Sequence, residues 1–233
     1  VEIEISNECR NIRVADNGNG IHKDDVILAF SRHATSKITS EKDLWNISTL
    51  GFRGEVLASI ISISKLTCYT RTSDSSVGYK VDCQRSEISI SETGCAVGTV
   101  MEVKDLFYNV PARMKFLKKP QTELANIVEI VQNIAISHPE VSFNLIHKNN
   151  SILKTSGSNN LSTVLSEIYS KELLKELSEV FKEDIPLNLA VKGFVSKPDF
   201  TRSNKKAIYL FINGRAVKCP VISKAIDNAY KDL

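Results

Sequence analysis

The stretch Gly51-Phe52-Arg53-Gly54-Glu55-Val56-Leu57-Ala58-Ser59-Ile60 is the best starting point for the fold. Two glycines enclose an aromatic residue and an arginine, and Val56, Leu57 and Ile60 follow at helical spacing. The glycines therefore predict a turn that opens a helix. A helix start presents free backbone N–H groups that suit an anion such as phosphate, and the Arg53 guanidinium would add further donors. An ordinary Gly-rich loop before a core helix is the alternative.

A second glycine-rich loop, Asp16-Asn17-Gly18-Asn19-Gly20-Ile21, lies upstream and follows a predicted strand. Glycine lets the main chain come close to a ligand. An ionised Asp16 only accepts hydrogen bonds, so it could recognise an exocyclic amine such as that of adenine. A surface hairpin loop with an Asx-turn at Asp16 is the alternative. The polar, basic segment Ser31–Ile38 is either a loop or a second group of phosphate-facing donors.

Apolar residues alternate with polar ones in some segments and recur at helical spacing in others, so the sequence predicts a mixture of α and β elements. The predicted strands are Val1–Ile5, Ile12–Val14, Ile63–Thr70, Tyr79–Cys83, Glu87–Ser91, Gly98–Lys104, Phe143–Ile146, Ile152–Lys154, Leu187–Val195 and Ala207–Ile212. The predicted helices are Lys23–Phe30, Gln121–Ser137, Leu161–Phe181 and one that begins at Pro220. The Ser-, Gly- and Asn-rich segment Thr155–Asn160 is the best linker, so we expect domains at 1–156 and 157–233.

Composition is that of a soluble globular protein, with 42% hydrophobic and 24% charged residues. No apolar run approaches the ~20 residues that span a bilayer, so we expect no membrane association. The net charge of +3 is uneven, because residues 1–112 hold 12 basic and 15 acidic residues whereas residues 113–233 hold 18 and 12. Eight basic residues and one acid lie between Lys192 and Lys224. This stretch indicates contact with a polyanion such as DNA, or simply a solvated face.

The five cysteines are widely spaced and form no Cys-x-x-Cys pair. They indicate neither a disulfide framework nor a zinc site, and buried or incidental thiols are the favoured interpretation.

Several segments together resemble the MutL family of DNA mismatch-repair proteins, which belongs to the GHKL ATPases. DNGNGI at Asp16–Ile21 is similar to the adenine-binding motif of the whole superfamily. The segments that resemble MutL itself are SRHATSKI at Ser31–Ile38, TLGFRGEVLASI at Thr49–Ile60, VGTVMEVKDLFYNVPARMKF at Val97–Phe116 and FINGRAV at Phe211–Val217. The likeness covers nearly the whole chain. It implies an α+β fold, in which a Bergerat-type GHKL ATPase sandwich precedes a smaller transducer domain like ribosomal protein S-five.

The resemblance also implies the site residues. Asp16 would bind the adenine amine, Gly18 and Gly20 would let the base sit close, and Gly98 and Thr99 would complete the pocket. The phosphate side would consist of lid residues Thr35, Ser36 and Lys37 and of a cradle formed by Arg53, Gly54, Glu55, Val56 and Leu57. Arg215 matches a position associated with DNA in the family, and its basic neighbours in sequence are Lys197, Arg202, Lys205 and Lys206.

The chain begins in the middle of a strand pattern, so we expect a truncated N-terminal end, and the resemblance implies that the C-terminal end is truncated too. In the family, the glutamate that activates water and the asparagine that holds Mg²⁺ precede the first strand, so both would lie upstream of Val1. No catalytic or Mg²⁺-binding residue is therefore expected here, and the chain should hydrolyse ATP poorly. Glu129 and Asn133 share the Glu-x-x-x-Asn spacing but are interpreted as surface residues of a helix. The lysine that reaches the γ-phosphate and the C-terminal dimerisation region would follow Leu233.

The leading hypothesis is a mismatch-repair ATPase, in which ATP binding and hydrolysis with Mg²⁺ act as a conformational switch. Its partners would be DNA, a MutS-like mismatch-recognition protein and a second copy of the protein, which would join through the C-terminal region and, on ATP binding, through the N-terminal halves. The bacterial cytoplasm is the favoured location, because no basic targeting tract suggests a nucleus. The alternatives are a chiefly DNA-binding module and another GHKL member, such as a gyrase-type topoisomerase subunit, a heat-shock chaperone or a histidine kinase.

Overall fold

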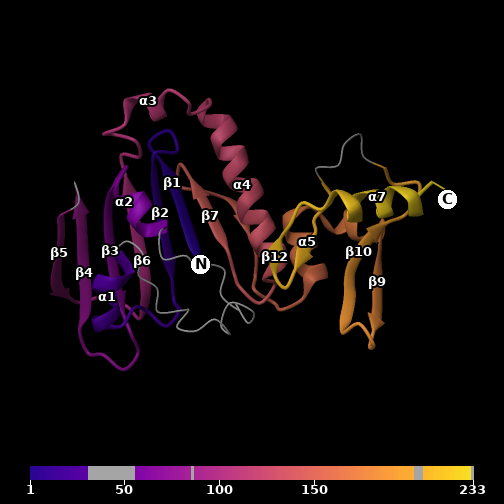
Figure 1. Ribbon diagram of the computed structural model, residues 1–233, viewed down its shortest axis with the longest axis horizontal. Helices are drawn as coiled ribbons and strands as arrows, with labels where there is room; N and C mark the ends of the chain where they lie inside the picture. The colour runs from indigo at the N-terminus through magenta and orange to yellow at the C-terminus, as the bar shows by residue number, and fades with distance from the viewer. Residues whose placement is uncertain (31–55, 85–86, 202–206, 232–233) are drawn as a thin grey trace. The chain divides into compact units, whose positions relative to one another are not determined.

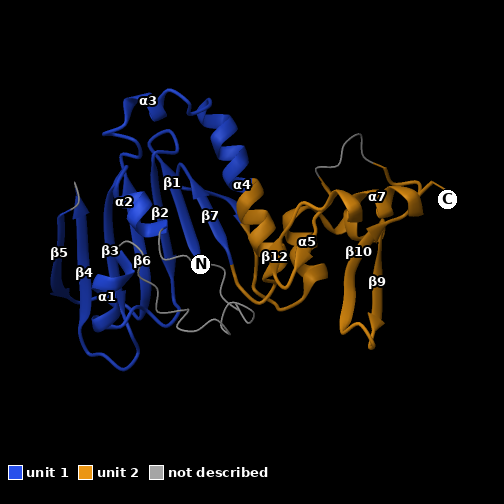
Figure 2. Cartoon of the chain, viewed as in Figure 1, with its two compact units in different colours: residues 1–128, 143–153 blue, residues 129–142, 154–233 orange. Residues whose placement is uncertain are grey.

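The computed structural model describes residues 1–30, 56–84, 87–201 and 207–231 (Figure 1). Contacts divide the chain into two compact units, coloured separately in Figure 2. The first comprises Val1–Val128 and Phe143–Leu153, and the second comprises Glu129–Ser142 and Lys154–Leu233.

An eight-stranded sheet forms the first unit, with the strand order β5-β4-β3-β6-β2-β1-β7-β8. The strands from β5 to β1 pair antiparallel, whereas β1 and β7 are parallel. The bounds of the strands are β1 Glu2–Ser6, β2 Asn11–Asp16, β3 Lys65–Arg71, β4 Gly78–Gln84, β5 Glu87–Thr93, β6 Gly98–Lys104, β7 Asn144–His147 and β8 Asn150–Lys154. The strands predicted for this part of the chain are thus confirmed.

Strands β3, β4 and β6 bury one face against two helices, α1 (Lys23–Phe30) and α2 (Val56–Ile61). In β3, alternate residues are buried, because successive side chains of a strand point to opposite faces. Leu66 and Cys68 of β3 pack with Val26, Phe30 and Ile61 of the two helices, and Val81 and Cys83 of β4 complete the cluster. Helices on one face of a mixed sheet make this unit an α+β fold.

The opposite face of the sheet is polar. Arg13 Nη1 lies 2.8 Å from Glu4 Oε1 and 3.2 Å from Glu2 Oε1 across the β1–β2 pair. Further along the same face, Thr67 Oγ1 of β3 donates to Asp82 Oδ1 of β4 at 2.8 Å. Charged and hydroxyl side chains therefore alternate with the apolar residues of the buried face, which is the pattern of a sheet with one solvated side.

Two helices follow β6, namely α3 (Pro111–Met114) and α4 (Pro120–Ser137). The predicted helix Gln121–Ser137 is confirmed as α4. The division between the units falls inside this helix, after Val128.

Among its described residues, the second unit contains the C-terminal half of α4, two small antiparallel sheets and three further helices (Figure 2). Strand β9 (Leu177–Asp184) pairs with β10 (Leu189–Ser196), and β11 (Phe211–Ile212) pairs with β12 (Arg215–Ala216). The helices are α5 (Leu161–Ile168), α6 (Lys171–Lys175) and α7 (Pro220–Ala229). The helix that was predicted to begin at Pro220 is confirmed.

The prediction of one helix over Leu161–Phe181 is wrong. α5 ends at Ile168, and Ser170 caps a new helix by accepting a hydrogen bond from Leu173 N at 3.3 Å. From Leu177 the chain is a strand, because Leu177–Asp184 pairs residue by residue with Leu189–Ser196. The helical spacing of apolar residues continued into this strand, but ladder hydrogen bonds to a distant segment outweigh local periodicity.

Two further expectations compare with the structure as follows. The buried strand predicted for Ala207–Ile212 is reduced to β11, Phe211–Ile212, where Ile212 is exposed. The boundary between the compact units falls between Leu153 and Lys154, and α4 is divided between the two units. The domain division at 156/157 stays a prediction.

Candidate functional site

Asp16 is the last residue of β2 and is exposed. Its Oδ1 accepts hydrogen bonds from Gly18 N at 2.9 Å and from Thr99 N at 3.3 Å. The carboxylate is thus held between the loop that follows β2 and the start of β6. Both of these hydrogen bonds use Oδ1, so Oδ2 is the oxygen that can accept a donor from a ligand.

Two glycines beside Asp16 have backbones that exclude a side chain. At Gly98, φ is +115° and a Cβ would lie 2.2 Å from the carbonyl oxygen of Asp16. At Gly20, φ is +73° and a Cβ would lie 2.2 Å from the carbonyl oxygen of Arg71. These are backbone contacts that cannot give way as a flexible side chain would. At Gly18, a Cβ would lie 3.1 Å from Asp16 Oδ1. The close approach of the main chain to a ligand, which the sequence predicts for Gly18 and Gly20, stays a prediction.

The sheet register places Asp16, Thr99 and Thr70 opposite one another on three neighbouring strands. Asp16 pairs with Thr99 across β2 and β6, and Thr99 pairs with Thr70 across β6 and β3. Thr70 is fully buried and its hydroxyl contacts Ile21 N, Gly98 O and Thr99 Oγ1. Thr70 was absent from the predicted site residues. Its signal in the sequence was a polar residue at an inward position of a predicted strand.

The predicted phosphate side is only partly within the described residues. Thr35, Ser36, Lys37, Arg53, Gly54 and Glu55 lie outside them. Val56 and Leu57 are the first two described residues of α2, so the chain that follows the predicted glycine turn is helical. Val56 is 63% exposed, and Leu57 packs against the apolar core.

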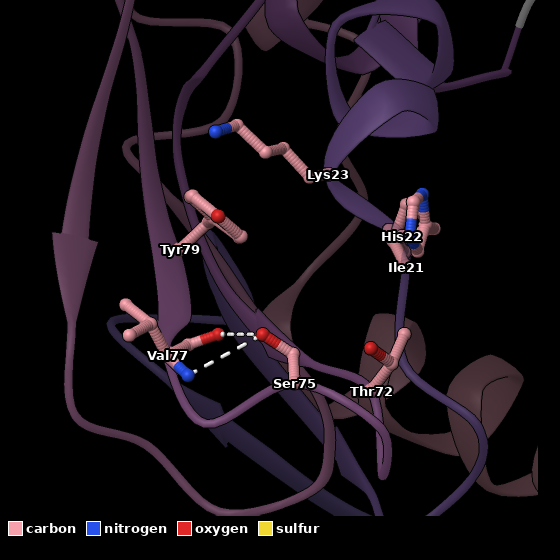
Figure 3. A pocket seen from close by; sticks show the side chains of 7 residues that line it. All are labelled: Ile21, His22, Lys23, Thr72, Ser75, Val77 and Tyr79. Carbon is pink, nitrogen blue, oxygen red and sulfur yellow. Dashed lines mark hydrogen bonds between the residues drawn. The ribbon is translucent and has the colours of Figure 1, made fainter.

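A small pocket lies beside Gly20 (Figure 3), between the start of α1 and the segment that joins β3 to β4. Its lining includes Ile21, Lys23 and Tyr79, and Lys23 Nζ lies 5.9 Å from the centre of the Tyr79 ring. Ser75 Oγ donates to Val77 O at 2.7 Å and closes the turn at its edge. Among the described residues, none of the predicted nucleotide contacts lines this pocket.

Two buried thiols, Cys68 of β3 and Cys83 of β4, lie on the same face of the sheet as Thr70. Burial raises the pKa of Cys68 to about 12, with smaller contributions from Cys83, Cys95 and Asp16. Burial likewise raises the pKa of Cys83 to about 11. Both thiols stay protonated at neutral pH, so neither is a nucleophile. All five cysteines are free, as the sequence indicated.

The predicted DNA-binding residues fall in the second unit. Arg215 opens β12, directly after a tight turn in which Asn213 and Gly214 have φ values of +49° and +76°. Lys197 Nζ lies 3.6 Å from Glu176 Oε2, with its side chain 46% exposed. Arg202, Lys205 and Lys206 lie outside the described residues.

The Glu129–Asn133 pair has the character expected of helix surface residues. Both are on α4, and Asn133 Nδ2 donates to the backbone carbonyl of Glu129 at 2.9 Å. That bond is a local contact one helical turn long.

Two family models match the chain. Residues 1–99 match the model of the histidine kinase-, DNA gyrase B- and HSP90-like ATPases. Residues 165–233 match the model described as the C-terminal domain of DNA mismatch repair protein. The first match contains Asp16, Gly98 and Thr99, and the second contains Arg215.

Curated relatives and a solved structure extend these matches. The DNA mismatch repair protein MutL of Agathobacter rectalis is 45% identical over 223 residues, which are 95% of this chain and 34% of that protein. MutL of Staphylococcus saprophyticus is 44% identical over 234 residues, which are 100% of this chain and 35% of that protein. The chain thus spans about a third of the length of these relatives. The solved MutL ATPase domain of Aquifex aeolicus complexed with ADP is 29% identical, with a TM-score of 0.71, over 97% of this chain and 78% of that one.

The GHKL-type sheet with Asp16 at the end of β2, the two matched models and the similarity to MutL along the chain all agree. The chain belongs to the MutL family of DNA mismatch repair proteins.

Proposed function

We propose that this chain is the N-terminal ATP-binding region of a mismatch-repair protein, and that ATP binding and hydrolysis there switch the protein between conformations. The observation that carries the proposal is the Asp16 carboxylate, which is held by two backbone N–H groups at the exposed end of a strand, beside glycines that exclude side chains. The similar Aquifex aeolicus MutL ATPase domain was solved with ADP.

The groups around Asp16 suit an adenine ring. An adenine presents its exocyclic amine as a donor, and Asp16 Oδ2 is a matching acceptor. Gly18 and Gly98 bring backbone rather than side chains to the same place, so a flat base could approach closely. We therefore assign Asp16, Gly18, Gly20, Gly98 and Thr99 to the base.

The phosphate side is proposed from the family motifs. The lid would comprise Thr35, Ser36 and Lys37, and the cradle would comprise Arg53, Gly54, Glu55, Val56 and Leu57. Mg²⁺ would accompany the triphosphate and neutralise its charge. Among the described residues, no three His, Cys, Asp or Glu side chains form a metal site, so Mg²⁺ is proposed from the motifs alone.

A glutamate base upstream of Val1 is expected for hydrolysis. Removal of a general base slows a reaction by roughly 10²–10⁴-fold, so we expect the 233-residue chain to turn ATP over slowly. Robust turnover by this chain would show that the base has been misplaced.

The test of the proposal is an ADP titration by calorimetry with Asp16→Ala. Loss of a hydrogen bond to a charged group typically costs ~1.5–3 kcal/mol, so we expect the Kd to rise at least about tenfold. Asp82→Ala is the matched control, because it removes the same charge from the opposite, polar face of the sheet, where Asp82 pairs with Lys80. Equal ADP affinity in the wild type and Asp16→Ala would refute the assignment of Asp16 to adenine.

DNA binding by the second unit is a second candidate function, favoured by the eight basic residues that share Lys192–Lys224 with one acid. Arg215→Glu should weaken binding to duplexes of any sequence and should reduce the log–log salt slope by about 0.9 for each phosphate contact that is lost. Lys148→Glu, a charge reversal at an exposed turn in the first unit, is the control. Affinity that does not depend on salt would show that the basic stretch is only a solvated surface.

The remaining assignments concern the whole protein. We propose a MutS-like mismatch-recognition protein and DNA as partners, a homodimer that forms through a C-terminal region and through ATP-dependent association of the N-terminal halves, and a bacterial cytoplasmic location. Within the part of the chain that the structure describes, no helix is long and apolar enough to cross a bilayer.

A further inference from the structure

Asp16, Thr99 and Thr70 form a row across β2, β6 and β3, and Thr70, at the β3 end of this row, is fully shielded from solvent. A buried hydroxyl is stable only when it is hydrogen-bonded, and this one connects two segments that are far apart in sequence. Its Oγ1 accepts a hydrogen bond from Ile21 N at 2.8 Å. The same oxygen lies 3.2 Å from Gly98 O and 3.2 Å from Thr99 Oγ1.

These three contacts account for the capacity of one hydroxyl, which has one proton to donate and two lone pairs to accept with. One lone pair receives the Ile21 amide. The proton goes to Gly98 O or Thr99 Oγ1, and in the first case the hydroxyl of Thr99 can donate to the second lone pair. With either arrangement, Thr70 joins the end of the DNGNGI loop to the start of β6.

The two segments that Thr70 joins are also the two that hold Asp16. Gly18 N donates from the loop and Thr99 N donates from β6, and both reach Asp16 Oδ1. The direction of the carboxylate therefore depends on the separation between the loop and β6. Thr70, on the neighbouring strand β3, contacts both segments and so sets that separation.

We propose that Thr70 is a positioning residue for adenine recognition, which holds the loop and β6 at the distance that aims the Asp16 carboxylate at the base. This inference rests on the proposed function, since it assumes that Asp16 binds adenine. Thr70 itself would not contact the nucleotide, so its effect must pass through Ile21, Gly98 and Thr99.

The test compares the Kd values of ADP and GDP for the wild type and for Thr70→Val. Valine has nearly the shape of threonine but lacks the hydroxyl, so the Ile21 amide loses its acceptor and the connection to β6 is cut. We expect the Kd of ADP to rise about tenfold. Guanine has no amine at the position that Asp16 would recognise, so the Kd of GDP should change little and the preference for ADP should fall about tenfold as well.

Two further variants separate positioning from general damage. Thr67→Val is the matched control on the same strand, because it deletes the Thr67–Asp82 hydrogen bond on the opposite face and should leave the ADP preference unchanged. Thr70→Ser keeps the hydroxyl and should restore the preference. It also carries the test if Thr70→Val does not fold, and a folded Thr70→Ser protein that has lost the ADP preference would overturn the proposal.

The outcomes distinguish this inference from the proposed function. A wild type that does not prefer ADP to GDP refutes the adenine assignment of Asp16 itself. A wild type that prefers ADP, together with a folded Thr70→Val protein that has the same preference, overturns the role of Thr70 and leaves the proposed function standing. An equal loss of ADP and GDP affinity in Thr70→Val would likewise overturn it, because the residue would then be merely structural.

Discussion

Replacement of Gly98 by alanine should damage the stability of the first unit and its nucleotide affinity together. Gly98 opens β6 with φ at +115°, a conformation that favours glycine. The added Cβ would lie 2.2 Å from the carbonyl oxygen of Asp16 and 2.9 Å from Asn17 Cα. Both neighbours are backbone atoms of the segment that carries the candidate site, so neither can rotate away.

The expected magnitude follows from these distances. Real Cβ contacts are essentially never below 3.0 Å, so the start of β6 must withdraw from the 2.2 Å position by about 0.8 Å. The Thr99 N–Asp16 Oδ1 hydrogen bond is already 3.3 Å long and would break. Backbone strain of this type costs about 1–3 kcal/mol and the lost hydrogen bond about 1 kcal/mol more. We therefore expect a destabilisation of roughly 2–4 kcal/mol.

Urea unfolding followed by circular dichroism gives the free energy of unfolding, and an ADP titration of the folded protein gives the affinity. The affinity should fall at least about tenfold, because Asp16 loses one of the two donors that orient it. Gly94→Ala is the control, since Gly94 has no positive φ in the left-handed region and nothing lies within 4 Å of its added Cβ.

Gly94→Ala should change the free energy of unfolding by no more than about 0.5 kcal/mol. If Gly98→Ala proved as stable as Gly94→Ala and bound ADP equally well, the close approach of β6 to Asp16 could not be what shapes the site.

Two more predictions concern stability. Cys68 has a folded pKa of about 12 against an ordinary value of 9.0, so above pH 9 the unfolded state binds fewer protons and the free energy of unfolding falls as pH rises towards 12. For this thiol, the free energy of unfolding should fall by up to about 1.4 kcal/mol per pH unit. Urea unfolding of the wild type and of Cys68→Ala between pH 8 and 10.5 tests this, because the variant should lack the contribution of Cys68. Equal dependence of the free energy of unfolding on pH in the two proteins would contradict the raised pKa of Cys68. Asn160 Oδ1 caps α5 by accepting a hydrogen bond from Thr163 N at 3.1 Å, so Asn160→Ala should destabilise the second unit by about 1 kcal/mol. Amide hydrogen exchange should become faster in the first turn of α5 and should stay unchanged in α1, which serves as the control.

Local patterns determined most of the elements. Alternation at Ile63–Thr70 and Gly98–Lys104 predicted strands that the structure confirms as β3 and β6, since a strand with one buried face must repeat every two residues. The helical conformation of Val56–Ile61 was likewise foreseeable from the spacing of its apolar residues.

Local patterns failed where a distant partner decided the conformation. The apolar spacing after Leu161 continued at a helical period as far as Phe181, yet Leu177–Asp184 pairs with Leu189–Ser196 as a strand. The spacing of residues within Leu161–Phe181 carries no information on the pairing of β9 with β10, because the hydrogen bonds of that pairing come from the other strand.

The candidate site shows the same division. The residues alone indicated that Asp16 could accept a donor from a base and that Gly18 and Gly20 could let the main chain come close, because these are properties of each position. The resemblance to the MutL family added Gly98 and Thr99, and the assignment of all five to a base stays a prediction. Only the tertiary structure decided that Thr99 N reaches a carboxylate 83 residues earlier in the chain. The same register placed Thr70 opposite Thr99, where its hydroxyl reaches Ile21 N, whereas sequence alone marks Thr70 only as a polar residue in an apolar strand. Sheet register is a property of strands in contact, and it therefore appears only when the chain has folded.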